Sequence, residues 1–184
     1  MISKGHLSKF NLKIKMTYFD KFIDFITRHN LYESKSFIEI SNKTKNINYN
    51  NEESRDFIGC FYKVENEIIT DFNVCVPQII DEQTLLINIH EYVHALIIYN
   101  SLGKKEDIGL EKEVLPMMYE EMYVVESDEI STKKYLKQQK ETINEMNSEE
   151  YIIGSQIKDK IIYMYPDLET QLKNARLLAK TYKK

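Results

Sequence analysis

A chain of 184 residues with 42% hydrophobic and 29% charged side chains is long enough for one domain with a buried core, and residues 1–184 are predicted to form that single domain. A net charge of −4 without a concentrated basic stretch argues against a nucleic-acid partner. No apolar run approaches the length of a membrane span, and the N-terminal residues lack a signal peptide. A cytoplasmic protein with no membrane partner is therefore expected.

The N-terminal half of the chain predicts one helix, one loop and a hairpin. Aromatic and aliphatic residues recur at helical spacing from Tyr18 to His29, which is typical of an amphipathic helix. Ser41–Ser54 is rich in Asn, Lys and Ser and is predicted to be an exposed loop. Two strands follow, Phe57–Val64 and Ile68–Val76, and the polar turn Glu65–Glu67 joins them into a β-hairpin.

Two cysteines, Cys60 and Cys75, fall on the predicted strands. Two cysteines do not make a disulfide framework, and they lack the paired spacing of a zinc finger. Both are therefore predicted to be small buried side chains with free thiols.

A long apolar segment from Thr84 to Tyr99 is predicted to be a buried helix. Its N-cap is expected at Asp81 or Thr84, because Asp and Thr side chains can accept the first free backbone N–H groups. Gly103 is expected to cap its C-terminal end.

The C-terminal half is predicted to be helical. Pro116 is predicted to lie in the first turn of one helix, which runs on toward Tyr135. Two more are predicted at Glu149–Tyr163 and Leu168–Tyr182. Together these elements predict an α+β fold that is mostly helical, with a small hairpin or sheet preceding the long apolar helix.

The pentapeptide from His90 to His94 has the pattern H-E-x-x-H and lies inside this apolar helix. Residues four apart lie one above the other on a helix, so both imidazoles can bind one metal ion. Glu91 then lies close enough to act on a water at the open metal position without being a ligand. Two of the four histidines in the chain belong to this motif, and zinc is the predicted metal.

A catalytic zinc needs a third protein ligand. The other two histidines, His6 and His29, precede the motif, so no third histidine follows it. A carboxylate from the next helix is expected instead, and both Glu113 and Glu120 are within reach. Each lies among apolar residues, where an unpaired carboxylate would be costly. These arguments leave the choice between the two open.

The motif, followed by Glu113-Val-Leu-Pro116-Met-Met-Tyr-Glu120, resembles the thimet oligopeptidase and oligopeptidase F family of zinc peptidases. The resemblance implies a zincin-like core in which Glu113 is the third zinc ligand and Glu120 supports the ligands from behind. Pro116 departs from the family pattern, because it follows Glu113 by three residues where the family usually has two. Glu120 therefore remains the alternative ligand.

The resemblance extends to the stretch around Tyr151, where a family tyrosine donates a hydrogen bond to the reaction intermediate. It also implies that the edge of the hairpin pairs with an extended peptide substrate. The expected function is zinc-dependent hydrolysis of peptide bonds, with Glu91 as general base and Tyr151 as second catalytic residue. The alternative is a zincin-like zinc-binding regulatory or interaction module that does not turn over peptides. The sequence predicts neither the identity of the peptide or protein substrate nor an oligomeric state.

Overall fold

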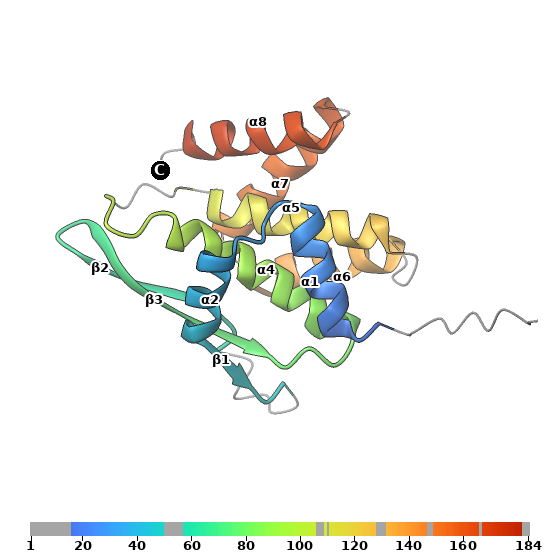
Figure 1. Cartoon of the computed structure of the whole chain (residues 1–184). Helices are drawn as coiled ribbons and strands as arrows, with labels where there is room; N and C mark the ends of the chain where they lie inside the picture. Colours follow the sequence, from blue (N-terminus) through green and yellow to red (C-terminus); the bar gives the residue numbers. More distant parts are fainter. Residues whose placement is uncertain are drawn as a thin grey trace, which may run out of the picture.

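The chain combines helices with one small sheet, and the computed structural model shows how they are layered (Figure 1). The structure describes residues 16–49, 57–105, 109, 111–127, 132–146, 149–165 and 167–181. The predicted α+β class with mostly helical content is confirmed. The elements are α1 (Tyr18–Arg28), α2 (Ser34–Lys43), β1 (Thr44–Ile47), β2 (Gly59–Glu65), β3 (Ile68–Pro77), α4 (Glu82–Tyr99), α5 (Glu111–Glu126), α6 (Thr132–Met146), α7 (Glu149–Met164) and α8 (Leu168–Thr181).

Helix α4 lies between the sheet and the C-terminal helices (Figure 1). It packs against β3 and β2 on one side and against α5 on the other, while α1 and α2 also contact it. Helix α5 in turn packs against α7 and α8. A helix that is apolar on nearly all sides is expected to be buried, and α4 has neighbours on most of its surface. No helix in the described part of the chain is both long and apolar enough to span a membrane.

The predicted hairpin is confirmed and belongs to a three-stranded sheet in the order β1-β3-β2. Asn66 and Glu67 form its turn with φ angles of 52° and 64°. Two successive residues in the left-handed region make the kind of tight turn whose twist matches the strands it joins. Strand β2 pairs with β3 along one edge, and its other edge has no strand partner among the residues that the structure describes.

The two cysteines lie on neighbouring strands as predicted, and both are free and half-buried. Cys75 pairs with Gly59, whereas Cys60 pairs with Val74. Because successive side chains of a strand point to opposite faces, Cys60 faces the core and Cys75 faces the other side of the sheet. This register keeps the two thiols apart.

The prediction of a loop over Ser41–Ser54 is wrong for its first part. Helix α2 continues to Lys43, and Thr44–Ile47 forms β1, which pairs in parallel with the end of β3. Ser34 to Lys43 was also not predicted as a helix. Residues 50–54 of the predicted loop lie outside the described residues. The four residues of β1 lack the alternation of apolar and polar side chains that predicts a strand. Their strand conformation therefore depends on pairing with β3.

The ends of α4 are partly as predicted. Asp81 is its N-cap, and it forms a capping box with Thr84, whose backbone N–H donates to the Asp81 carboxylate at 2.8 Å. The C-cap is Asn100, not Gly103. Gly103 lies three residues further on with φ at 72°, and its backbone N–H donates to the Ile69 carbonyl at 2.9 Å. Gly103 therefore turns the chain back along β3 rather than ending the helix.

Two predictions for the next segment are wrong. Pro116 lies inside α5, in its second turn, because that helix already begins at Glu111. The helix ends at Glu126 and does not run on to Tyr135, which belongs to the separate helix α6. A proline in the second turn removes one backbone hydrogen bond, and the burial of Pro116 against the core compensates for that loss. The last two helices lie where they were predicted, although Tyr182 is outside the described residues.

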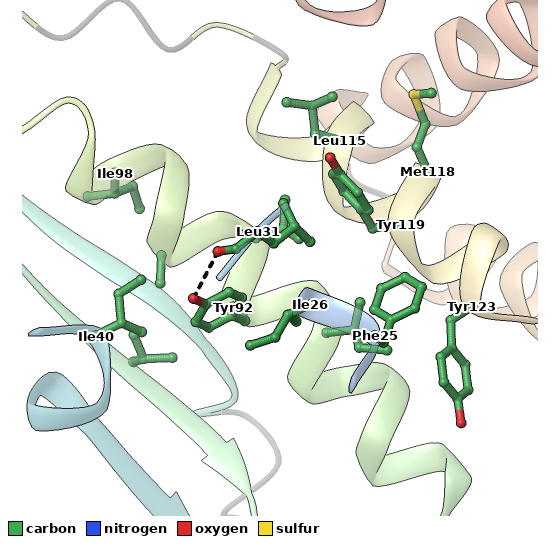
Figure 2. Close-up of a cluster of buried hydrophobic side chains, with 14 of the residues drawn as sticks. Phe25, Ile26, Leu31, Ile40, Tyr92, Ile98, Leu115, Met118, Tyr119 and Tyr123 are labelled. Carbon is green, nitrogen blue, oxygen red and sulfur yellow. Dashed lines mark hydrogen bonds between the residues drawn. The ribbon is translucent and has the colours of Figure 1, made fainter. Parts of the chain in front are cut away.

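The core between α1, α4 and α5 fixes the rotation of α4 about its axis (Figure 2). Tyr92, the third residue of the motif, is 5% exposed, and its hydroxyl donates to the Leu31 carbonyl at 3.2 Å. Its ring also meets Phe22 edge-on, with centroids 5.5 Å apart. Consecutive residues of a helix are about 100° apart, so His90 and His94 lie roughly 200° around the helix from Tyr92. Anchoring Tyr92 on the α1 side therefore turns both histidines toward α5 and α7.

Candidate metal centre

Helix α4 brings the three motif side chains together. The ligand atoms of His90, Glu91 and His94 all lie within 4.8 Å of one another. The two imidazole centroids are 4.7 Å apart, and their Nε2 atoms approach to 2.9 Å. Two zinc–nitrogen bonds of tetrahedral geometry would place these nitrogens about 3.3 Å apart, so a small side-chain movement would accommodate the ion.

The two histidines differ in charge. Burial works against a charge on His90, but the neighbouring carboxylates of Glu120, Glu91 and Glu113 outweigh it and raise the pKa of His90 to about 9. Burial and the nearby charge of His90 hold the pKa of His94 well below its ordinary value of 6.5. In this arrangement protonated His90 donates through Nε2 to neutral His94. A bound metal ion would replace that shared proton, because both nitrogens must then offer lone pairs.

Glu113 lies on α5 and faces the side of the motif where the two Nε2 atoms meet. Its Oε2 lies 3.9 Å from Nε2 of His94, and its side chain is 17% exposed. Helix α7 passes close behind it at Gly154, where an added Cβ would lie 3.0 Å from the Cβ of Glu113. The absence of a side chain at Gly154 therefore allows α7 to support α5 at this point.

Glu120 lies two turns further along α5 and meets the opposite edge of the His90 ring. Its Oε1 lies 2.9 Å from Nδ1 of His90. Its Oε2 accepts hydrogen bonds from the Tyr135 hydroxyl at 2.9 Å and from the Gln139 side-chain amide at 3.2 Å. Glu113 and Glu120 thus occupy different positions, one beside an Nε2 atom and the other beside Nδ1.

Glu91 is a buried carboxylate with one oxygen that lacks a hydrogen-bond partner among the described residues. It is 8% exposed, and the oxygen without a partner is Oε2. Burial raises the pKa of Glu91 to about 7, partly offset by the nearby charge of His90. The backbone N–H of Cys60 on β2 donates to this carboxylate. A buried carboxylate with a free oxygen beside two converging imidazoles is suited to accept a proton from a water molecule at the metal.

Tyr151 on α7 also lies at this site. Its ring centroid is 6.4 Å from that of His90. Burial raises the pKa of Tyr151 above its ordinary range, and the carboxylates of Glu120, Glu113 and Glu91 raise it further. The structure therefore gathers all six side chains singled out in the sequence into one cluster, in which His90 and Glu91 are buried and the other four are half-buried.

Comparison with known proteins returned no match, either to a family model, to a characterised protein or to a solved structure. The resemblance to the oligopeptidase family consequently stands on the motif residues and their spacing. The metal, the ligand set and the activity remain proposals that depend on the geometry described above.

Sequence reasoning missed three polar residues behind the site, namely Tyr135, Gln139 and Lys158. Tyr135 and Gln139 lie one helical turn apart on α6. Lys158 is fully buried on α7, on the helix face that it shares with the buried residues Ile157 and Ile161. A lysine inside an apolar stripe was the one available signal, since a buried ammonium group requires polar partners.

Proposed function

We propose that this chain is a zinc-dependent peptidase whose metal is held by His90, His94 and Glu113. The observation that carries the proposal is the approach of the two Nε2 atoms to 2.9 Å with a carboxylate oxygen 3.9 Å from one of them. Three protein ligands and one open position are the composition of a catalytic zinc site, whereas structural sites are closed by a fourth protein ligand.

Glu120 is poorly placed to be that fourth ligand. One of its oxygens contacts Nδ1 of His90, and the other accepts hydrogen bonds from Tyr135 and Gln139. Turning Glu120 toward the metal would break all three contacts. This arrangement favours a peptidase over the alternative of a closed zinc-binding module without turnover.

Zinc, when bound at such a site, polarises a carbonyl and lowers the pKa of a water molecule at its open position. Glu91 accepts the proton of the attacking water through its free Oε2 and delivers it to the departing amine. Burial raises the pKa of Glu91 in the metal-free protein, which makes its carboxylate a stronger base than an exposed glutamate. Tyr151 keeps its proton because its pKa is raised, so its hydroxyl can donate to the oxyanion that develops on the substrate.

An extended peptide is the proposed substrate, bound along the free edge of β2. The Cys60 backbone N–H reaches the Glu91 carboxylate, so this edge borders the site. Strand β2 pairs only with β3 within the described residues, which leaves backbone groups available for an added strand. Peptides bound in this way gain affinity from main-chain hydrogen bonds and specificity from alternating side chains.

The proposal is tested by adding zinc to the purified chain and measuring cleavage of a quenched fluorescent peptide library. Cleavage that requires zinc and disappears in Glu91→Gln is the expected result. A chain that binds one zinc ion tightly but cleaves no library member would favour the binding module. A chain that binds no zinc would refute the metal site itself.

A further inference from the structure

A polar network crosses the interface of α5, α6 and α7 behind the proposed ligands. It runs from Lys158 through Gln139 and Tyr135 to Glu120, which contacts Nδ1 of His90. Lys158 is fully buried, and Tyr135 and Gln139 are 4% and 8% exposed. Buried polar groups destabilise a core unless they form hydrogen bonds with one another. A hydrogen-bonded network directly behind a proposed ligand therefore suggests a role at the metal site.

The chemistry of Lys158 determines the direction of every hydrogen bond in the network. Its Nζ can only donate, so the amide atom that faces it at 3.3 Å must be Oε1 of Gln139. The amide nitrogen of Gln139 then points the other way and donates to Oε2 of Glu120 and to the Tyr135 hydroxyl. Because that hydroxyl accepts from Gln139, its own proton is free to donate to Glu120.

Lys158 is itself held in place by a second contact. Its Nζ donates to Oε2 of Glu121 at 2.5 Å, and it lies 3.2 Å from the Asp159 carboxylate. Glu121 follows Glu120 directly on α5, so the two neighbouring carboxylates are both tied into the same polar layer. The ammonium group therefore contacts two carboxylates in addition to Gln139.

We propose that Tyr135, Gln139 and Lys158 are positioning residues that hold Glu120 against His90 and so direct the His90 Nε2 lone pair toward the metal. Two donors on Oε2 of Glu120 leave Oε1 as the oxygen that meets the ring, 2.9 Å from Nδ1. The angle of this approach is outside hydrogen-bond limits, but a carboxylate this close to Nδ1 favours the proton on that nitrogen and so leaves Nε2 as the nitrogen that can ligate. This inference rests on the proposed metal site and extends it to α6 and to Lys158.

The test is the affinity of the folded protein for Zn²⁺, measured by competition with a chromophoric chelator, together with the visible spectrum of the Co²⁺-loaded protein. Tyr135→Phe removes one donor atom and is expected to weaken Zn²⁺ binding about tenfold. Gln139→Met removes the other donor and should weaken it by about ten- to a hundredfold and alter the Co²⁺ spectrum. Tyr163→Phe, at a tyrosine of α7 that is 92% exposed, is the matched control and should change neither reading.

The variant Lys158→Met tests whether Lys158 acts on Glu120 through Gln139. Since Lys158 reaches Glu120 through Gln139, its substitution should weaken Zn²⁺ binding in the wild-type background and have no further effect in Gln139→Met. Lys160→Met, at an exposed lysine of the same helix, controls for the loss of charge. Urea unfolding of the metal-free variants separates lost stability from lost affinity.

Unchanged Zn²⁺ affinity in folded Tyr135→Phe and Gln139→Met would overturn the inference and leave the network a purely structural role. A further loss of Zn²⁺ affinity from Lys158→Met in the Gln139→Met background would show that Lys158 does not act through Gln139. If the wild-type protein binds Zn²⁺ but cleaves no peptide, the proposed peptidase is refuted. Weaker Zn²⁺ binding in the variants would still support the positioning role in that case. A wild-type chain that binds neither Zn²⁺ nor Co²⁺ would overturn both.

Discussion

Replacement of Glu91 by glutamine should change stability and activity in opposite directions. Glu91 is 8% exposed, and burial raises its pKa from 4.5 to about 7. Above pH 7 this carboxylate is ionised but buried in the folded metal-free protein, whereas in the unfolded chain it is solvated by water. Folding at this pH therefore costs the free energy of desolvating the charge. Glutamine has nearly the same shape without the charge, so Glu91→Gln should stabilise the metal-free fold at alkaline pH.

The size and pH range of the effect follow from the pKa. A rise from 4.5 to about 7 corresponds to about 3 kcal/mol of lost stability once the group is ionised in both states. The loss is absent below pH 4.5, grows between pH 4.5 and 7, and is complete above pH 7. The amide of the variant still buries polar atoms that lack partners, which costs about 1 kcal/mol or more. A net gain of about 2 kcal/mol is therefore expected at pH 8, and a net loss of about 1 kcal/mol at pH 4.

The assay is urea unfolding of wild type and Glu91→Gln in the presence of a chelator at pH 4 and pH 8. Glu39→Gln, at an exposed glutamate of α2, is the matched control and should show no pH-dependent difference from wild type. A stability difference that is the same at both pH values, or a variant that is less stable at pH 8, would refute the electrostatic argument.

The same variant tests the proposed chemistry. With zinc bound, Glu91→Gln should retain the metal and lose peptidase activity by a factor of about 10² to 10⁴, the usual contribution of a general base. Full activity with zinc retained would show that another group accepts the proton.

Five further substitutions test the remaining parts of the site. His94→Ala should abolish zinc binding and remove the stability that zinc binding adds, which is about 4 kcal/mol at a zinc concentration about 1,000 times Kd. The shift of the urea midpoint on adding zinc measures this loss, and a variant that still binds one zinc ion would contradict the site. Glu113→Ala should weaken zinc binding far more than Glu120→Ala, because only Glu113 lies beside an Nε2 atom, and the opposite order in a chelator competition would exchange their roles. Gly154→Ala should destabilise the fold by about 1 kcal/mol and weaken zinc binding. The added methyl group would lie 3.0 Å from Glu113, and this overpacking costs more than the roughly 1 kcal/mol that alanine gains in helix propensity. If urea unfolding shows the variant to be as stable as wild type, α7 can shift to make room. Tyr151→Phe should lower kcat about a hundredfold at unchanged zinc affinity, and an unchanged kcat would assign this tyrosine to packing alone.

Several features that depend mainly on neighbouring residues were predicted correctly from the sequence. The two histidines share a face of α4 because they are one helical turn apart, and Asp81 caps that helix because its side chain is of the right kind at the right place. The hairpin followed from two apolar runs separated by a polar turn. In each case the energies that decide the structure act over a few residues.

Features that depend on distant partners were predicted wrongly or not at all. Strand β1 is polar and four residues long, so only β3 at its side makes it a strand. Pro116 was expected in a first turn but lies in a second, because the start of α5 could not be read from the chain around it. Lys158 was overlooked because its partners come from α5 and α6.

The sequence by itself determined that two carboxylates would approach the motif from one side, since Glu113 and Glu120 are seven residues apart and seven residues make nearly two helical turns. Which nitrogen each carboxylate meets depends on how far α5 is shifted along α4 and on what fills the space behind it. That shift is set by packing, with Gly154 admitting α7 close to Glu113 and with Tyr135 holding Glu120 against Nδ1 of His90. A displacement of α5 by nearly two helical turns, about 10.5 Å, would bring one carboxylate to the position of the other without altering any local preference of the chain. Only the tertiary structure could therefore separate their roles.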